Sequence, residues 1–106
     1  MLQKKKRVTK STFQTIMEKG SIISGSFFVF RYIKQDFSQI AFVAPKKIAK
    51  TAVKRNSLRR IGYNIIRIYD LKPCAGIFFF KKESLSIKTP ELKKDIDFIL
   101  KKARIL

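Results

Sequence analysis

One stretch in the middle of the chain, residues 49–70, carries two side-chain patterns at once. Its large apolar residues recur at intervals of three, four and three, the spacing that stacks side chains on one side of an α-helix. At about 3.6 residues per turn, an Asn, a Tyr and three Arg fall on the other side. We therefore predict a helix that packs on a sheet through one face and turns a cationic face outward. The apolar residues are Leu58, Ile61, Ile65 and Ile68, and those opposite are Asn56, Arg59, Arg60, Tyr63 and Arg67.

Two further helices are predicted, one on each side of this segment. Ser11 and Gln14 have the spacing of a capping box, which predicts a short helix over residues 12–19 that ends at the following Gly. Thr89 followed by a Pro is typical of a helix start, with the Thr as the N-cap. This last helix is predicted to run to the end of the chain and to bury one face. The face consists of Leu92, Ile96, Ile99, Leu100 and Ala103.

Three β-strands are predicted from runs of aromatic and β-branched residues. The first covers residues 26–34 and the second residues 40–44, and the turn-like segment between them predicts that they pair as a hairpin. The third strand, residues 76–81, is apolar enough to be covered on both faces. Since strands and helices are mixed along a short chain, we expect one domain over residues 1–106, with residues 1–10 as a flexible basic arm.

The charge balance indicates the kind of partner. The chain has 25 Lys and Arg against 7 Asp and Glu, a formal net charge of +18. So much positive charge on a small body lowers stability through self-repulsion, and a polyanionic partner is the simplest reason to keep it. The chain has no His, which excludes an imidazole base. A single cysteine, Cys74, leaves no material for a zinc site or an internal disulfide, and we interpret it as a small packed residue.

Nothing in the sequence predicts a membrane location. The longest apolar run is far below the about 18 residues that cross a bilayer. The basic N-terminal cluster has no apolar stretch behind it, so it is not predicted to be a secretory signal. We expect a soluble, cytoplasmic protein with no membrane partner and no obligate protein partner.

The cations of the middle segment stand without acids. Residues 41–67 contain eight Lys and Arg and no Asp or Glu, although surface helices usually interleave the two signs. Arginine forks match phosphate oxygens, and each neutralised phosphate releases counterions, so the segment predicts a nucleic-acid surface. An ordinary soluble basic helix is the alternative. Asn56 can meet a base edge or a ribose hydroxyl because its amide both donates and accepts, or it is a simple surface residue.

Two motifs in this region carry a resemblance to a known family. Phe-Val-Ala-Pro-Lys-Lys at residues 42–47 and Val-Lys-Arg-Asn-Ser-Leu-Arg-Arg at residues 53–60 resemble the signature of the bacterial ribonuclease P protein subunit. That family has a Lys-Lys pair after a strand and then an Arg-Asn-Arg-x-Lys-Arg helix. Residues 12–20 are similar to its first helix. Two departures are Ser57, which replaces the second Arg of the motif, and Gly62, which costs a helix about 1 kcal/mol relative to Ala.

The resemblance implies a fold and a division of labour. The fold is α+β, a mixed sheet of about four strands packed with three helices, with a left-handed βαβ crossover around the motif helix. The fourth strand would come from a split within residues 21–47. The partners implied are the ribonuclease P RNA and the 5′ leader of precursor tRNA. The RNA is the catalyst and hydrolyses the phosphodiester with Mg²⁺ held by the RNA–substrate complex, so no catalytic side chains are expected in this chain.

The resemblance also implies two binding surfaces. The RNA-binding residues carried over by position, with one more Arg of the same helix face, are Lys46, Lys47, Lys54, Arg55, Asn56, Arg59, Arg60 and Arg67. The leader groove would lie between the first helix and the sheet, and strand alternation puts either of two residue sets on it. We favour the aromatic set because exposed rings stack on single-stranded bases, although ordinary core packing of these rings is the alternative. The favoured groove residues are Phe13, Met17, Phe28, Phe30 and Tyr32, and the other strand set is Phe27, Val29 and Arg31.

Two other functions compete with this one. A small ribosomal protein or RNA assembly factor would explain the charge and the size equally well. A basic protein of the membrane surface is the third hypothesis. The cations, however, follow one helix beside an Asn and lack the bulky apolar anchors of a membrane-surface helix.

Overall fold

The computed structural model describes residues 8–105 of the chain. These residues form three α-helices, four β-strands and one short 3₁₀ helix, which confirms the predicted α+β class. Residues 1–7 of the predicted flexible arm lie outside the described residues, and Lys10 already begins the first helix. The elements in chain order are α1 Lys10–Lys19, β1 Ser21–Ser24, β2 Phe28–Lys34, β3 Gln39–Val43, α2 Ala52–Ile66, β4 Cys74–Phe80, η2 Lys82–Ser86 and α3 Thr89–Ala103.

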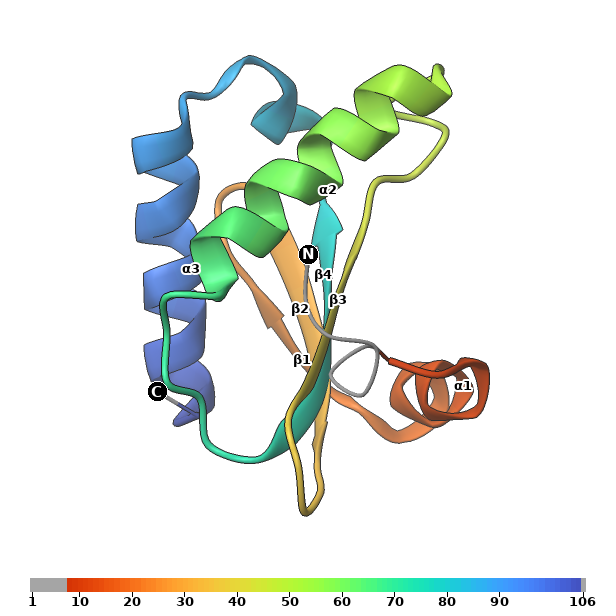
Figure 1. Ribbon diagram of the computed structural model, residues 1–106, viewed down its shortest axis with the longest axis vertical. Coiled ribbons are helices and arrows are strands. Elements are labelled where there is room, and N and C mark those ends of the chain that lie inside the picture. Colours follow the sequence, from red (N-terminus) through yellow and green to blue (C-terminus); the bar gives the residue numbers. More distant parts are fainter. Residues whose placement is uncertain (1–7, 106) are drawn as a thin grey trace.

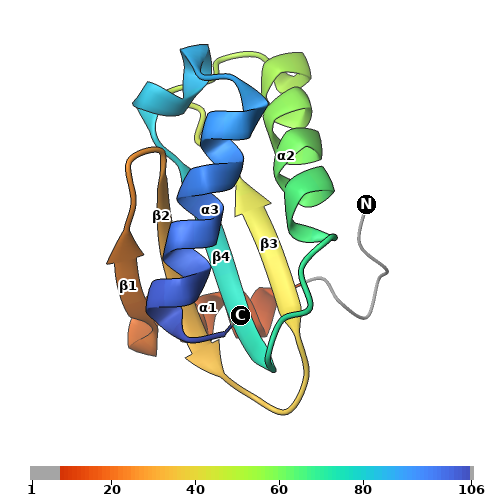
Figure 2. The ribbon, with the colours of Figure 1, turned by 90° about the vertical axis from the view of Figure 1, so that its left-hand side faces the viewer.

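The strands form one mixed sheet between two helical layers. Helices α2 and α3 lie in front of the sheet in Figure 2, and α1 lies behind it, which Figure 1 shows from the side. The strand order is β1-β2-β4-β3, with β3 and β4 parallel and the other pairs antiparallel. The predicted hairpin between residues 26–34 and 40–44 is therefore wrong, because β4 lies between β2 and β3. The nearly all-apolar β4 takes the central place, where helices cover both faces.

The parallel pair depends on α2. Parallel neighbours need a long connection, and β3 reaches β4 through a βαβ crossover whose helix is α2. The left-handed sense of this crossover stays a prediction. The fourth strand, β1, comes from residues 21–24, within the segment expected to supply it.

The main core lies between the sheet and the α2–α3 layer. Five Phe side chains of β2, β3 and β4 meet there at centroid distances of 4.3 to 6.2 Å, in stacked, edge-on and tilted pairs. The predicted apolar face of α3 is confirmed, since all five of its residues are buried. A smaller cluster forms on the opposite face, where Ile16 of α1 packs against Ala75 and Ile77 of β4. The five core rings belong to Phe28, Phe30, Phe42, Phe78 and Phe80.

Both predicted N-caps are displaced. α1 begins after Thr9, whose hydroxyl accepts the N–H of Thr12 at 3.3 Å, and not after Ser11. Thr9 offers the same capping chemistry two residues earlier, so the local pattern does not distinguish the two positions. α3 begins with Thr89 itself, and Lys88 precedes it without a side-chain cap.

A buried carboxylate fixes the turn between β1 and β2. Asp95 of α3 accepts the backbone N–H groups of Ser26, Phe27 and Phe28 at 2.8, 2.9 and 3.1 Å. Gly25 lies so close to this carboxylate that a Cβ there would fall 2.6 Å from one of its oxygens. The turn therefore joins the sheet to α3 through three hydrogen bonds to a charged group.

Candidate nucleic-acid interface

Helix α2 is held against β3 by a close contact at Gly62. A Cβ at this position would fall 2.6 Å from Cε1 and 2.8 Å from Cγ of the Phe42 ring, so only a residue without a side chain allows this approach. Leu58 and Ile65 are buried beside it, as predicted. The prediction for Ile68 is wrong, because α2 ends at Ile66 and Ile68 is 62% exposed. The chain leaves the helix there to reach β4.

Tyr63 belongs to the packing of this contact as well. Its ring meets Phe42 edge-on at 5.1 Å between centroids, and its hydroxyl accepts the backbone N–H of Phe42 at 3.3 Å. Since β3 is an edge strand, the tyrosine supplies a partner that no neighbouring strand offers. The ring predicted to stand among the cations is therefore half-buried against the sheet.

The outer face of α2 carries the predicted cations. Lys54, Arg60 and Arg67 are exposed, and Arg59 is half-buried. The guanidinium of Arg59 donates to the amide oxygen of Asn56, which orients both side chains on one side of the helix. The first turn of α2 has no acid, so no carboxylate there offsets the positive end of the helix dipole, which lies beside Lys54. This end of the molecule can attract phosphate groups and has no carboxylate of its own segment to compete with them.

The segment before α2 adds further lysines to this surface. Lys46 and Lys47 are exposed on the turn that follows β3, and Lys50 is exposed directly before the helix N-cap, Thr51. Arg55 behaves differently from the other cations. It is half-buried, and its Nη1 donates to the backbone oxygens of Ala49 at 3.0 Å and Lys50 at 3.1 Å. The RNA-binding residues expected from the sequence thus divide into the exposed cations, the pair of Arg59 and Asn56, and Arg55, which holds the backbone.

The favoured strand residues of the leader groove lie on the other face of the sheet. Phe28 and Phe30 are 0% exposed in the core beneath α2 and α3, and Tyr32 stacks on Phe30 at 5.2 Å. The prediction that these rings line a groove beside α1 is therefore wrong. The physical reason is volume, because the space between the sheet and two helices encloses the large core cluster, and the α1 side, covered by one helix, encloses a much smaller one.

The face of the sheet next to α1, here called the α1 face, carries part of the other strand set. Val29 is paired with Phe79 and Arg31 with Ile77, so these side chains share one face. Phe13 of α1 packs edge-on against Phe79 at 6.5 Å between centroids. Arg31 donates from Nη1 to the backbone oxygen of α1 at Met17, at 3.4 Å. The result is an apolar surface with one arginine beside α1.

Comparison with known proteins decides the family. A family model described as Ribonuclease P matches residues 2–104. The chain belongs to the ribonuclease P family. The ribonuclease P protein component of Syntrophomonas wolfei is 32% identical over 109 residues, which cover 97% of this chain and 91% of that protein. The component from Synechococcus sp. (strain JA-2-3B'a(2-13)) is 39% identical over 72 residues, but the match covers 65% of this chain and only 54% of that protein.

Solved structures of ribonuclease P proteins have the same fold. A Staphylococcus aureus RNase P protein, a mutant with defective mRNA degradation activity, superimposes with a TM-score of 0.88 at 21% identity and covers 97% of this chain and 92% of its own. The RNase P protein from Thermotoga maritima gives 0.81 at 21% identity, with 91% and 96% covered. At this level of identity the likeness shows the fold. The resemblance seen in the sequence is confirmed.

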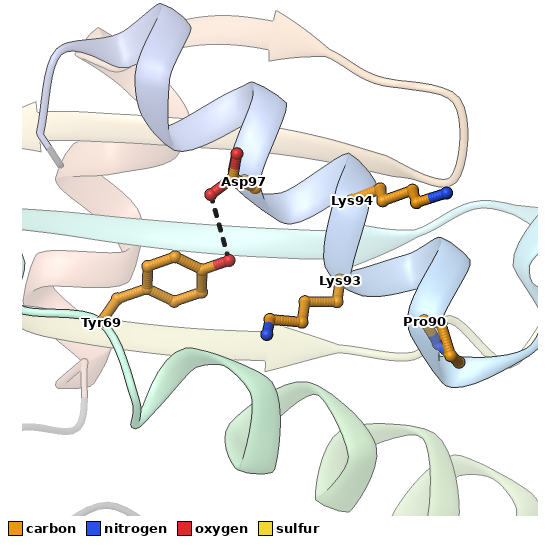
Figure 3. Close-up of a pocket in the computed structure, with 5 residues that line it drawn as sticks. All are labelled: Tyr69, Pro90, Lys93, Lys94 and Asp97. Atoms are coloured by element: carbon orange, nitrogen blue, oxygen red, sulfur yellow. Dashed lines mark hydrogen bonds between the residues drawn. The ribbon is translucent and has the colours of Figure 1, made fainter.

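A separate pocket of about 400 Å³ lies beside α3 and is lined by residues that the sequence did not predict to form a site (Figure 3). The Tyr69 hydroxyl donates to Oδ1 of Asp97 at 3.3 Å, and the other carboxylate oxygen pairs with Lys101 at 2.9 Å. The hydrogen bond from Lys101 holds the pKa of Asp97 below its usual range, and burial raises the pKa of Tyr69. These polar groups bind one another and tie the segment that follows α2 to α3. The lining residues are Tyr69, Pro90, Lys93, Lys94 and Asp97.

Within residues 8–105, no three or more His, Cys, Asp and Glu side chains gather in a way that could hold a metal ion. No helix in the same part of the chain is both long and apolar enough to cross a membrane.

Proposed function

We propose that this chain is the protein subunit of ribonuclease P and binds the catalytic RNA through α2 and the turn before it. The family match supports the chain's membership of this complex, and one observation supports the location of its RNA-binding surface. The exposed cations of residues 46–67 lie on α2 and on the loop that precedes its positive end, with no acid in the segment. Such a surface neutralises phosphates by counterion release, and the oriented Asn56 adds a group that can read a base or ribose.

We place the chemistry in the RNA. The reaction proposed is Mg²⁺-dependent hydrolysis of the phosphodiester at the mature 5′ end of tRNA. The chain has no His to act as an imidazole base, and residues 8–105 offer no cluster of metal ligands, so the proposal assigns Mg²⁺ to the RNA–substrate complex. The protein's part is to bind and to orient. In this scheme the protein works in the cytoplasm together with its RNA.

The 5′ leader of precursor tRNA is proposed to lie on the α1 face of the sheet. We propose that Phe13, which is half-buried, and Met17, which is 38% exposed, take part in this site. Val29 and Phe79 supply apolar contact for unpaired bases, and Arg31 supplies a cation for a phosphate. The leader site is tested by comparing precursor tRNA with mature tRNA, because only the precursor is expected to bind more tightly when the protein is present.

The experiment for the function is a cleavage assay with the cognate RNA. The protein is expected to lower the Mg²⁺ or substrate concentration needed for correct 5′ cleavage at near-physiological salt. The double variant Arg59→Ala with Arg60→Ala should bind the RNA more weakly. Its salt dependence should flatten by about one unit for each lost phosphate contact. RNA binding without any effect on cleavage would instead indicate a ribosomal protein or assembly factor, and would overturn the proposal.

A further inference from the structure

The turn between β3 and α2 places lysines at the edge of the proposed RNA surface. The backbone oxygen of Pro45 accepts the N–H groups of Ile48 and Ala49, both at 3.1 Å. The Ala49 side chain is 3% exposed and anchors the turn in the core. Lys46 and Lys47 lie between these fixed points and are exposed. Residues 45–50 are called the lysine turn below.

The end of the lysine turn is held by a side chain from the helix that follows. Nη1 of Arg55 carries two hydrogens, and it donates to the oxygens of both Ala49 and Lys50. These two carbonyls precede the N-cap Thr51, so they lie outside the repeating hydrogen bonds of the helix. The hydrogen bond to the Ala49 oxygen is partly buried, so the arginine supplies a partner that this carbonyl needs, and the same nitrogen also holds the exposed oxygen of Lys50. The guanidinium thus fixes the backbone path from the turn into α2.

We propose that Arg55 is a positioning residue, which holds the lysine turn in the shape that binds RNA and does not itself neutralise a phosphate. The inference rests on the proposed function, because it assigns a distinct role within that same surface. A turn already ordered in the free protein does not have to be ordered on binding, and that saving in conformational entropy appears as affinity. A phosphate contact, by contrast, would release counterions and would appear in the salt dependence.

The experiment combines four variants of the full chain with a fifth, in which Arg55→Ala is added to Lys46→Ala and Lys47→Ala. Arg55→Ala removes both the charge and the donors, and Arg55→Gln removes the charge but keeps an amide donor. Arg60→Ala is the matched control, since Arg60 is exposed on the same helix. The double variant Lys46→Ala with Lys47→Ala removes the exposed charges of the lysine turn. Each is measured for urea stability, for amide hydrogen exchange of residues 46–51 in the free protein, and for affinity to the ribonuclease P RNA over a range of salt.

The expected results separate the two roles. Arg55→Ala should speed exchange in the lysine turn and weaken RNA binding about ten-fold, the cost of ordering roughly one residue of backbone. Its salt slope should fall by less than half a unit, whereas Arg60→Ala should lose close to 0.9. Arg55→Gln should recover part of the affinity. In the double-lysine background Arg55→Ala should weaken binding less than three-fold, because residues that act through one another are not additive.

Three results would overturn the proposal. These are a slope loss for Arg55→Ala equal to that of Arg60→Ala, a full ten-fold effect in the double-lysine background, and unchanged exchange in the lysine turn. The exchange measurement uses the free protein. If the chain does not bind ribonuclease P RNA at all, the proposed function fails, while the exchange result still tells whether Arg55 orders the turn.

Discussion

Replacing Gly62 by Ala is expected to destabilise the protein, against what helix propensity predicts. In an exposed helix interior the change from Gly to Ala adds about 1 kcal/mol of stability. At this position the new Cβ would fall 2.6 Å from Cε1 and 2.8 Å from Cγ of Phe42, whereas carbon atoms in contact sit about 3.5 to 4.0 Å apart. Either the ring or the whole helix must move.

The magnitude depends on how firmly the ring is held. Phe42 is 3% exposed, stacks on Phe78 at 5.0 Å and meets Tyr63 edge-on at 5.1 Å, so it has no free space to turn into. Overpacking a well-filled core costs about 1 to 3 kcal/mol, and a ring held on several sides puts this case near the upper end. Subtracting the propensity gain leaves a loss of about 2 kcal/mol. For a domain of this size that corresponds to a fall in Tm of roughly 8 °C.

The assay is urea unfolding followed by far-UV circular dichroism. Ser57→Ala is the matched control, because Ser57 is exposed on the same helix and its replacement should add about 0.5 kcal/mol of stability. In a Phe42→Leu background, where the ring is gone, Gly62→Ala should become neutral or stabilising. A Gly62→Ala variant as stable as the wild type, or one that loses the same stability in both backgrounds, would refute the argument from close packing.

Three further predictions concern stability. Asp95→Ala should lower the free energy of unfolding by about 3 kcal/mol, because three backbone N–H groups lose a charged acceptor. Asp95→Asn keeps one oxygen and should lose about half as much stability, so equal losses in urea unfolding would contradict this. Arg104→Gly should add about 0.5 to 1 kcal/mol, because Arg104 has a φ of 61° at the C-cap of α3; an unchanged urea midpoint would argue against backbone strain there. Burial raises the pKa of the Cys74 thiol to about 11, so ionisation favours the unfolded chain as pH rises. Between pH about 8 and 10 the free energy of unfolding of the wild type should fall by about 1 kcal/mol more than that of Cys74→Ala. Parallel pH profiles of the two proteins would refute this prediction.

Much of the secondary structure follows from local sequence. Residue periodicity and side-chain shape predict the apolar face of α3 and the strands β2, β3 and β4. The exact helix starts do not follow from local sequence, because Thr9 and Ser11 offer the same capping chemistry and only Thr9 is the N-cap. The pairing of strands also escaped local analysis. The short turn between β2 and β3 suggested a hairpin. The strand β4, which follows α2 in the chain, lies between them instead, and the residues of the turn do not indicate this.

The candidate site divides in the same way. The cationic character of residues 41–67 is visible in the sequence, since it requires only counting charges at helical spacing. Which cation is exposed and which holds the backbone is not visible, because the partners of Arg55 become neighbours only when the turn closes. The role of Gly62 is hidden for a related reason. Its partner Phe42 lies on another element, and from the sequence alone the glycine is predicted only to lower the stability of the helix.

The sequence by itself determined the three helices and the three apolar strands of this protein, apart from their exact ends, together with its acid-free basic segment and its family. Each of these depends on residues that are close along the chain or on motifs that survive as short strings. Only the tertiary structure decided the strand order, the face of β2 on which Phe28 and Phe30 lie, and the division of labour among the cations. These depend on contacts between distant segments. A strand has two faces and two edges, and only the volumes and hydrogen-bond partners brought by the other elements determine how each is used.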